Sequence, residues 1–186
     1  SYRVWNRLYH QFGKDLGFKQ VESKWIGSYD YPDGTHITYP RFYDDGHALT
    51  SYVNRLRYRY DVETDQAVVE RSGSLPSGDL VMESSITVER KTWPVTSIAN
   101  GALDNCTSVT SVTIPSSITT IGELAFRYCE LDSVKLCSVN PIVCPVNAFD
   151  ESVYDNAVLI VPKGWKQKKA AKVGPAWGRF KNIRYY

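Results

Sequence analysis

A repeat with a period of 23 residues constrains the fold of this chain more than any other feature of its sequence. Apolar, small and cysteine side chains recur in pairs at this spacing. The pairs are Val95 and Ile118, Ile98 and Ile121, Ala102 and Ala125, Leu103 and Phe126, and Cys106 and Cys129. A third, degenerate copy contains Ala148-Phe149 and then Leu159-Ile-Val-Pro162. Because a fixed period of about 20 to 50 residues is typical of units that stack on one another, the sequence predicts a solenoid.

The segment after each cysteine predicts a short strand. Val109, Val112 and Ile114 have the one-four-six spacing with which a leucine-rich repeat turns three apolar side chains inward. In the next copy the offset falls to 22 residues, so that Val134 corresponds to Val112 and Leu136 to Ile114. Alternation along a strand then directs the residues between them outward. The predicted outward residues are Ser111, Thr113, Ser133 and Lys135.

The flanks of the repeats are predicted to act as caps, because one unit cannot cover its own apolar face and about three are needed to outweigh the chain entropy lost. Upstream, residues 56–60 alternate large and charged side chains, and residues 78–82 and 86–88 favour short strands. Downstream, Lys and Ala residues favour a helix from Trp165 to Val173 that Gly174-Pro175 ends. Apolar anchors follow it at Trp177, Phe180 and Ile183.

Three segments result from this division. Residues 1–50 are an aromatic-rich N-terminal segment of unknown fold, residues 51–92 a β-rich N-terminal cap, and residues 93–186 the repeats with a C-terminal cap.

Several stretches of the chain resemble the BspA-like leucine-rich repeat family, found in Bacteroides-type bacteria and some protists. They run over residues 78–88, 93–98, 110–117 and 121–126, and residues 159–164 are similar to the segment that closes such arrays. The resemblance implies a mainly β fold with short helices: a short leucine-rich-repeat-type solenoid with a β-rich N-terminal cap and a C-terminal helical cap. It also implies a secreted or cell-surface protein that binds host proteins, glycans or other cells, with no catalytic centre and no cofactor.

Composition adds little to the choice of partner. With 22 basic and 20 acidic side chains the net charge is only +2, so no large field favours nucleic acid. We expect no transmembrane segment, because no apolar run approaches about 18 residues. The first residues lack a signal peptide, which we expect to have been removed from a secreted protein. The chain has no nucleophile elbow, metalloprotease motif, phosphate loop or dinucleotide fingerprint.

The four cysteines lack the spacing of a metal site, and no metal is predicted. Cys106 and Cys129 are expected at equivalent places in neighbouring coils, about 5 Å apart. They are either buried thiols or a disulfide. Cys137 and Cys144 enclose a loop that a disulfide could close in an oxidising compartment.

A cluster of basic residues lies near the end of the chain. It consists of Lys163, Lys166, Lys168, Lys169 and Lys172, followed by Arg179, Lys181 and Arg184. The cluster is either a solvated helix face whose charge suits the C-terminal end of the helix dipole, or a site for an anionic glycan, lipid or partner.

The residues support three hypotheses for function. In the first, the chain is a non-catalytic binding or adhesion module that recognises a host protein or glycan through Ser111, Thr113, Ser133 and Lys135. In the second, it is a structural spacer or cap of a larger surface assembly, with no ligand of its own. The third, an enzyme within residues 1–50, needs a pocket that joins His36 or His47 to Asp44 or Asp45.

Overall fold

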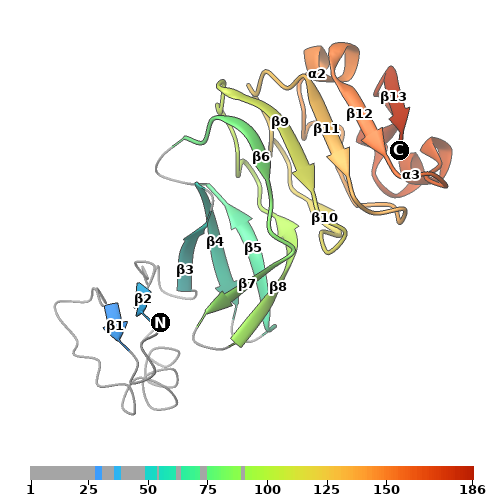
Figure 1. Ribbon diagram of the computed structural model, residues 1–186. Coiled ribbons are helices and arrows are strands. Elements are labelled where there is room, and N and C mark those ends of the chain that lie inside the picture. Colours follow the sequence, from blue (N-terminus) through green and yellow to red (C-terminus); the bar gives the residue numbers. More distant parts are fainter. Residues whose placement is uncertain are drawn as a thin grey trace.

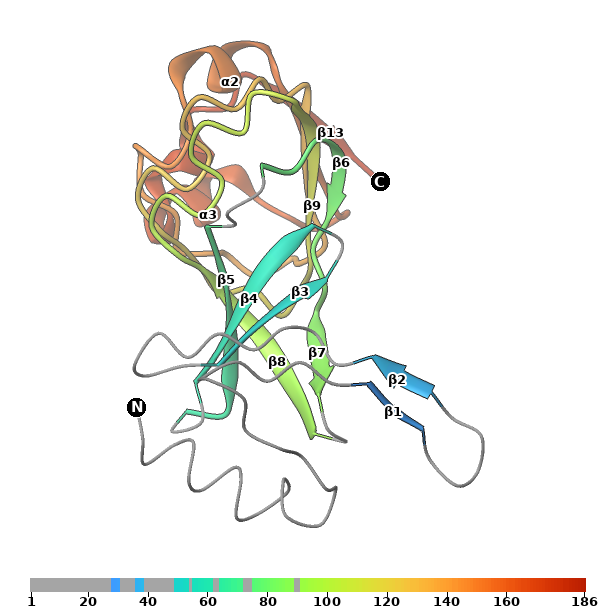
Figure 2. The same ribbon diagram turned by 90° about the vertical axis from the view of Figure 1, so that its left-hand side faces the viewer.

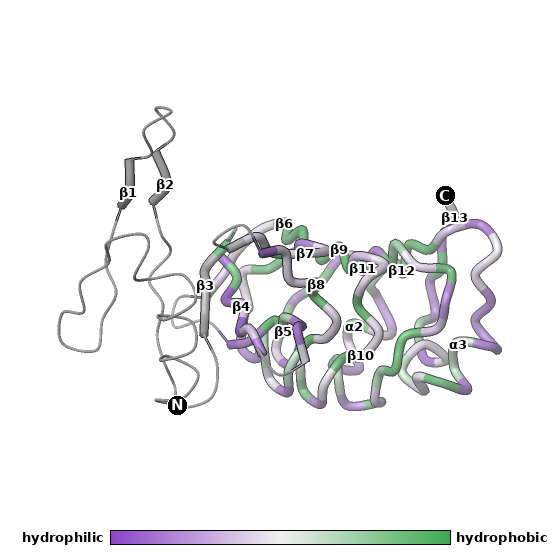
Figure 3. The backbone as a smooth tube through the Cα atoms, turned by 90° about the horizontal axis from the view of Figure 1, so that it is seen from below, coloured by the Kyte–Doolittle hydropathy of each residue, from purple (hydrophilic) through white to green (hydrophobic). Residues whose placement is uncertain are grey.

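The structure, a computed structural model, describes residues 28–30, 36–38, 49–53, 55–61, 64–71, 75–88 and 91–186. Over these residues the fold is mainly β with few helices, and successive coils of the chain lie side by side (Figures 1 and 2). Along each coil, hydrophobic stretches alternate with hydrophilic ones (Figure 3). A first pair of strands, β1 (Ser28–Asp30) and β2 (His36–Thr38), is antiparallel.

One face of the stack is a parallel sheet of five strands in the order β13-β12-β11-β9-β6. Its strands are β6 (Gly78–Val81), β9 (Val109–Ile114), β11 (Ser133–Leu136), β12 (Val158–Val161) and β13 (Asn182–Tyr185). Val112 pairs with Val134, and Ile114 with Leu136. The predicted third copy also holds, because Leu159 pairs with Val134. The inward and outward alternation predicted from the one-four-six spacing is thus confirmed for β9 and β11.

A second sheet has the order β10-β8-β5-β4-β3, and β7 pairs with β8. Its strands are β3 (Leu49–Val53), β4 (Leu56–Asp61), β5 (Gln66–Glu70), β7 (Ser85–Val88), β8 (Lys91–Ile98) and β10 (Thr120–Ile121). Strands β10, β8 and β5 are parallel, whereas β5, β4 and β3 are antiparallel, as are β7 and β8. The segment from β5 to β6 therefore follows the same two-sheet path as the coils after it.

Short helices occupy the later coils. They are α2 (Glu151–Asn156), α3 (Gln167–Val173) and the 3-10 helix η2 (Pro175–Gly178). The helix predicted from Trp165 begins two residues later, at Gln167, and Trp165 itself is buried. The prediction was correct at the other end, where the N–H of Gly174 donates to the carbonyl of Ala170 and α3 ends.

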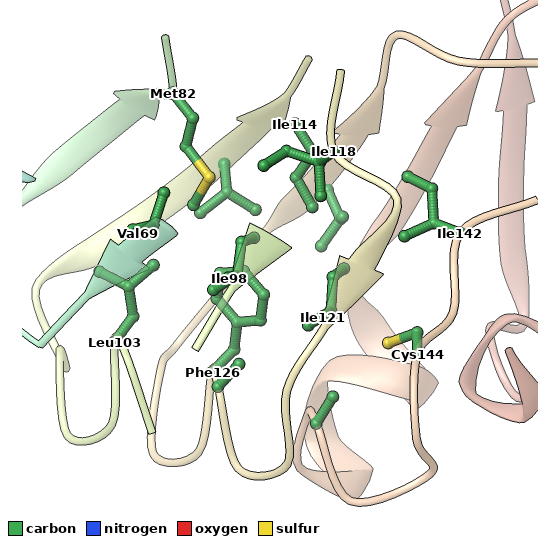
Figure 4. Close-up of a cluster of buried hydrophobic side chains, with 14 of the residues drawn as sticks. Val69, Met82, Ile98, Leu103, Ile114, Ile118, Ile121, Phe126, Ile142 and Cys144 are labelled. Carbon is green, nitrogen blue, oxygen red and sulfur yellow. The ribbon is translucent and has the colours of Figure 1, made fainter. Parts of the chain in front are cut away.

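The core runs along the stack, and equivalent residues of neighbouring coils meet in it (Figure 4). Ile98 pairs with Ile121, 23 residues later. The rings of Phe126 and Phe149 lie 4.7 Å apart at an interplanar angle of 2°. Toward the C-terminus, Phe149 also contacts a cluster of three further aromatic rings. These belong to Tyr154, Trp177 and Phe180.

The turns of neighbouring coils also keep the 23-residue spacing of the repeat. Gly101 and Leu124 both have positive φ, of 61° and 55°, and so do Asn105 and Tyr128, of 64° and 58°. Coil is linked to coil by backbone hydrogen bonds, such as the one from the N–H of Leu103 to the carbonyl of Ala125 at 2.8 Å. Because left-handed backbone costs about 1 kcal/mol or more for a non-glycine residue, the packing of the stack fixes these turns.

Candidate binding surface

The outward side chains of the five-stranded sheet lie in two rows across the strands, which we call the strand face. The first row contains Asp79, Ser111, Ser133, Val158 and Asn182. The second contains Val81, Thr113, Lys135, Ile160 and Arg184. Each row takes one residue from every strand, because parallel pairing keeps the strands in register.

The four residues predicted to bind a ligand are neighbours on this face. Ser111 lies beside Ser133, and Thr113 beside Lys135, on the adjacent strands β9 and β11. All four are partly exposed. The structure therefore brings together the residues that the alternation singled out, and their role in binding stays a prediction.

Polar contacts dominate the part of the strand face near β6. The Asp79 carboxylate accepts hydrogen bonds from the hydroxyl of Ser111, at 2.7 Å, and from that of Thr110, at 3.1 Å. These two bonds, first that of Ser111, hold the pKa of Asp79 below its usual range. The neighbouring Val81 is 58% exposed. This part thus offers a fixed negative charge beside an exposed apolar side chain.

The part from β11 to β13 combines apolar and basic groups. Val158 and Ile160 are partly exposed, and the ammonium of Lys135 lies 4.8 Å from the centre of the Tyr186 ring. The Tyr186 hydroxyl donates to the carbonyl of Leu136 at 3.2 Å, and burial, together with Cys137, raises its pKa. Arg184 has no acidic partner within the described residues. This part suits a ligand with both apolar and acidic groups.

Sequence reasoning missed six of the ten residues in these two rows. The alternation that placed Ser111 outward also places Val158 and Ile160 outward, because Leu159 and Val161 are buried in the third copy. The alternation in the third copy could therefore have predicted both residues. Tyr186 follows the last strand, and nothing in its spacing indicates the contact with Lys135.

A ladder of charges along the turns was also missed. Arg127 donates to Asp104 from Nε at 2.9 Å and from Nη2 at 2.8 Å, and Arg71 approaches the same carboxylate at 3.4 Å. Asp150 accepts from the backbone N–H of Tyr128 at 2.6 Å. Asp104, Arg127 and Asp150 are spaced by 23 residues, so the repeat itself contained the signal.

The cysteines divide into a stacked pair and two separate residues. Cys106 and Cys129 are buried, and the Cys129 thiol donates to the carbonyl of Leu103 at 3.1 Å. A hydrogen bond between the two thiols lowers the pKa of Cys106 and raises that of Cys129. Cys137 is partly exposed, whereas burial raises the pKa of the Cys144 thiol. All four are thiols in the structure, and the Cys137–Cys144 disulfide stays a prediction.

Three other expectations concern features outside the strand face. Within the described residues, no group of three or more His, Cys, Asp or Glu side chains is placed to hold a metal ion. No helix of that part of the chain is long and apolar enough to cross a bilayer. The side chains of His36, His47, Asp44 and Asp45, which the enzyme hypothesis requires, lie outside the described residues.

Comparison with known proteins gives a family match over part of the chain. Residues 82–157, less than half of the chain, match the family described as BspA type leucine rich repeat region (6 copies). None of the curated proteins compared with the chain matches it.

Several solved structures are similar to this one. A leucine-rich repeat protein from Bacteroides capillosus ATCC 29799 is 23% identical, with a TM-score of 0.49 over 74% of this chain and 98% of that one. The T. pallidum leucine-rich repeat protein is 18% identical, with a TM-score of 0.36 over 62% of this chain and 55% of that one. A leucine-rich repeat protein from Bacteroides ovatus ATCC 8483 is 17% identical, with a TM-score of 0.37 over 63% and 39%. By the family match, residues 82–157 of this chain are similar to a BspA type leucine rich repeat region.

Proposed function

We propose that this chain is a non-catalytic binding module, secreted or held at the cell surface, that recognises a host or bacterial surface protein or a glycan through the strand face. The observation that carries the proposal is that the side chains of the strand face lie in aligned rows but differ in chemistry from strand to strand. Its two rows hold hydroxyl, apolar, acidic and basic side chains at matched heights on five strands. A surface of this kind can complement one partner and exclude others.

The size of the face sets the expected affinity. Five strands spaced by about 4.8 Å span roughly 20 Å, and two rows add a height of roughly 10 Å. A stable protein interface usually buries about 800 Å² on each partner, which is larger than this face. We therefore expect weak binding by one copy, strengthened where several copies meet a repetitive target.

The ends of the stack have a supporting role in this proposal. The antiparallel strands β3 and β4 continue the second sheet beyond β5, and α3 with η2 lies beside the aromatic cluster. We infer that these segments are the N-terminal and C-terminal caps, because each would cover apolar surface that a terminal coil leaves open.

The test compares two variants that change the same residue types. The first replaces Ser111, Thr113, Ser133 and Lys135 with Ala. The control replaces Ser116, Thr120, Ser152 and Lys181, which are exposed and lie outside the five-stranded sheet. On arrays of host proteins and glycans, we expect the first variant to lose at least about tenfold in affinity and the control to bind like the wild type.

The alternative function, a spacer or cap of a larger surface assembly, has one observation in its favour. Part of the strand face is occupied by the chain's own contacts, between Asp79 and Ser111 and between Lys135 and Tyr186. This alternative predicts that the wild type binds nothing on the arrays. Equal binding by both variants would instead move the site away from these four residues.

A further inference from the structure

The basic residues near the C-terminus give the chain a strong charge asymmetry. Beyond Asp155 there are eight basic side chains and no acidic one, against 14 basic and 20 acidic side chains in the first 155 residues. Five of the eight are lysines on and just before α3, which we call the lysine cluster. They are Lys163, Lys166, Lys168, Lys169 and Lys172, and all are exposed.

These lysines differ from the basic residues that follow them. Arg179 forms an ion pair with Glu151, with a contact of 2.7 Å, and Lys181 forms one with Asp155 at 2.8 Å. Within the described part of the chain, no lysine of the cluster has an ion pair. Their charge is therefore neutralised only by solvent and salt.

The helix dipole does not account for the cluster. The sequence favoured a solvated face whose charge suits the C-terminal end of the helix, but α3 begins at Gln167, so Lys166 is its N-cap and Lys168 and Lys169 lie in its first turn. Only Lys172 lies in the last turn. Cations at the N-terminal end of a helix are unfavourable, and so are like charges three or four residues apart. The lysines form the solvated face that was predicted, but the helix dipole favours Lys172 alone among them.

Since these lysines do not stabilise α3, we propose that the lysine cluster is a binding site for a sulfated polysaccharide. This ligand carries a dense row of fixed negative charges, which complements a row of unpaired ammonium groups. From Lys166 to Lys172 the helix rises by about 9 Å, so the cluster matches a short stretch of a few sulfated sugars. The site is separate from the strand face and does not depend on the function proposed for it.

The surroundings of the cluster favour a polysaccharide over two other polyanions. An anionic membrane surface is held best by a helix that also inserts apolar side chains, but Trp165, Ala170 and Trp177 are buried. Among the large apolar side chains of α3 itself, only Val173, at 44% exposure, could insert. Single-stranded nucleic acid stacks on exposed aromatic rings, but Trp165, Trp177 and Phe180 are buried. Tyr186, whose carbonyl accepts a hydrogen bond from the N–H of Lys163, is exposed, but its ring already faces the ammonium of Lys135 at 4.8 Å.

The experiment measures retention of the whole chain on immobilised heparin. The test variant is Lys168→Gln, Lys169→Gln, Lys172→Gln. Its control is Lys91→Gln, Arg179→Gln, Lys181→Gln, which removes the same charge from side chains that are ion-paired with Asp65, Glu151 and Asp155. We expect the test variant to lose at least about tenfold in affinity with a shallower salt dependence, and the control to lose less than about threefold.

Two further measurements separate a lost site from a lost fold. A variant with Arg at positions 168, 169 and 172 keeps the charge and should keep the retention. The melting temperature of the Gln variant should stay the same or rise, because unfavourable charges leave the first turn of α3. A marked fall would show that the lysines are structural and would overturn the proposal.

Three results would also overturn it. The first is a wild type that heparin does not retain at physiological salt. The second is an equal loss by the test variant and the control. The third is binding to phosphatidylserine vesicles or duplex DNA that is as tight as binding to heparin, since the site would then be a general cation surface.

Discussion

The interior of the stack and its strand face obey different rules. Inside, a residue tends to be repeated in the next coil, as with Ile98 and Ile121, and Phe126 and Phe149. On the strand face Ser111 is repeated as Ser133, but the residue otherwise changes from strand to strand. Along the first row Ser133 is followed by Val158, and along the second Lys135 is followed by Ile160.

The difference has a packing cause. Neighbouring coils lie about 4.8 Å apart, so an inward side chain packs on its equivalent in the next coil and must be apolar and leave no gap there. An outward side chain meets solvent and carries no such restriction. The interior therefore specifies register and stability, whereas the strand face is free to specify a partner. Mutations can test this division of roles.

The largest expected effect is at Trp177, in the aromatic cluster of the interior. Its side chain is fully buried, and its Nε1 donates to the carbonyl of Ile142 at 2.7 Å. Trp177→Ala leaves a cavity beside Phe149 and Phe180 and an unpaired carbonyl. We expect a loss of about 3–5 kcal/mol in the free energy of unfolding, measured by urea denaturation.

Trp177→Phe serves as its control, because it keeps one ring but removes the N–H donor. It should lose clearly less than Trp177→Ala. If both variants unfolded at the urea concentration of the wild type, the last coil would not depend on this cluster.

The next effect is at Gly122, where two coils approach each other closely. A Cβ added there would lie 2.4 Å from Oδ1 of Asn100 and 2.5 Å from its backbone nitrogen. We expect Gly122→Ala to cost about 1–3 kcal/mol, because the coils must move apart. Thermal unfolding followed by circular dichroism measures the loss.

A double variant identifies which contact is responsible. Asn100→Ala removes Oδ1 but leaves the backbone nitrogen in place, so it should not restore the stability of Gly122→Ala. Full rescue by the double variant would mean that the backbones of the two coils can separate at little cost.

Much of the fold could be predicted from the sequence because the repeat encodes it. The pairing of Val112 with Val134 and of Ile114 with Leu136 follows from the spacing of apolar residues alone. The third copy was predicted from Leu159, although that strand lies 25 residues after its neighbour. Inward residues gave a reliable signal because they must match the coil beside them.

The pairing of two other strands could not be predicted from the repeat. Strand β6 places Leu80 beside Val112, 32 residues later, and the offset does not match the period of the later coils. Strand β13 places only the partly buried Ile183 toward the core, so its residues looked like single apolar anchors. Pairing of the backbone, which no residue pattern records, makes both segments part of the sheet.

The candidate sites differ in the same way. Four residues of the strand face followed from alternation, but the contact of Lys135 with Tyr186 depends on where the chain returns after β13. For the lysine cluster the sequence contained the charges and not their position on the helix. The later start of α3 makes Lys166 the N-cap and brings Lys169 into the first turn beside Lys168.

The smallest effect concerns Asp104, whose ion pair with Arg127 joins two coils at the 23-residue spacing of the interior although it lies on the turns. The hydrogen bonds from Arg127, and then the charges of Arg127 and Arg71, lower the pKa of Asp104. A group whose pKa is lowered by folding stabilises the folded state above its ordinary pKa of about 4, and this stabilisation is lost as the pH falls toward the lower value. We expect Asp104→Asn to cost about 1 kcal/mol at pH 7, since the pair is bidentate but partly exposed, and nearly nothing at pH 2 to 3.

Urea denaturation of both proteins at pH 7, 5 and 3 measures this convergence. The matched control is Asp132→Asn, because Asp132 is exposed and has no ion pair in the part of the chain that the structure describes. It should follow the wild type at each pH. If the cost of Asp104→Asn were the same at pH 3 as at pH 7, it would come from packing and not from charge. Packing would then restrict the residues of the turns as it restricts those of the interior. If there were no cost at any pH, the charge ladder would contribute nothing to register, and the requirement for matching residues would apply to the interior alone.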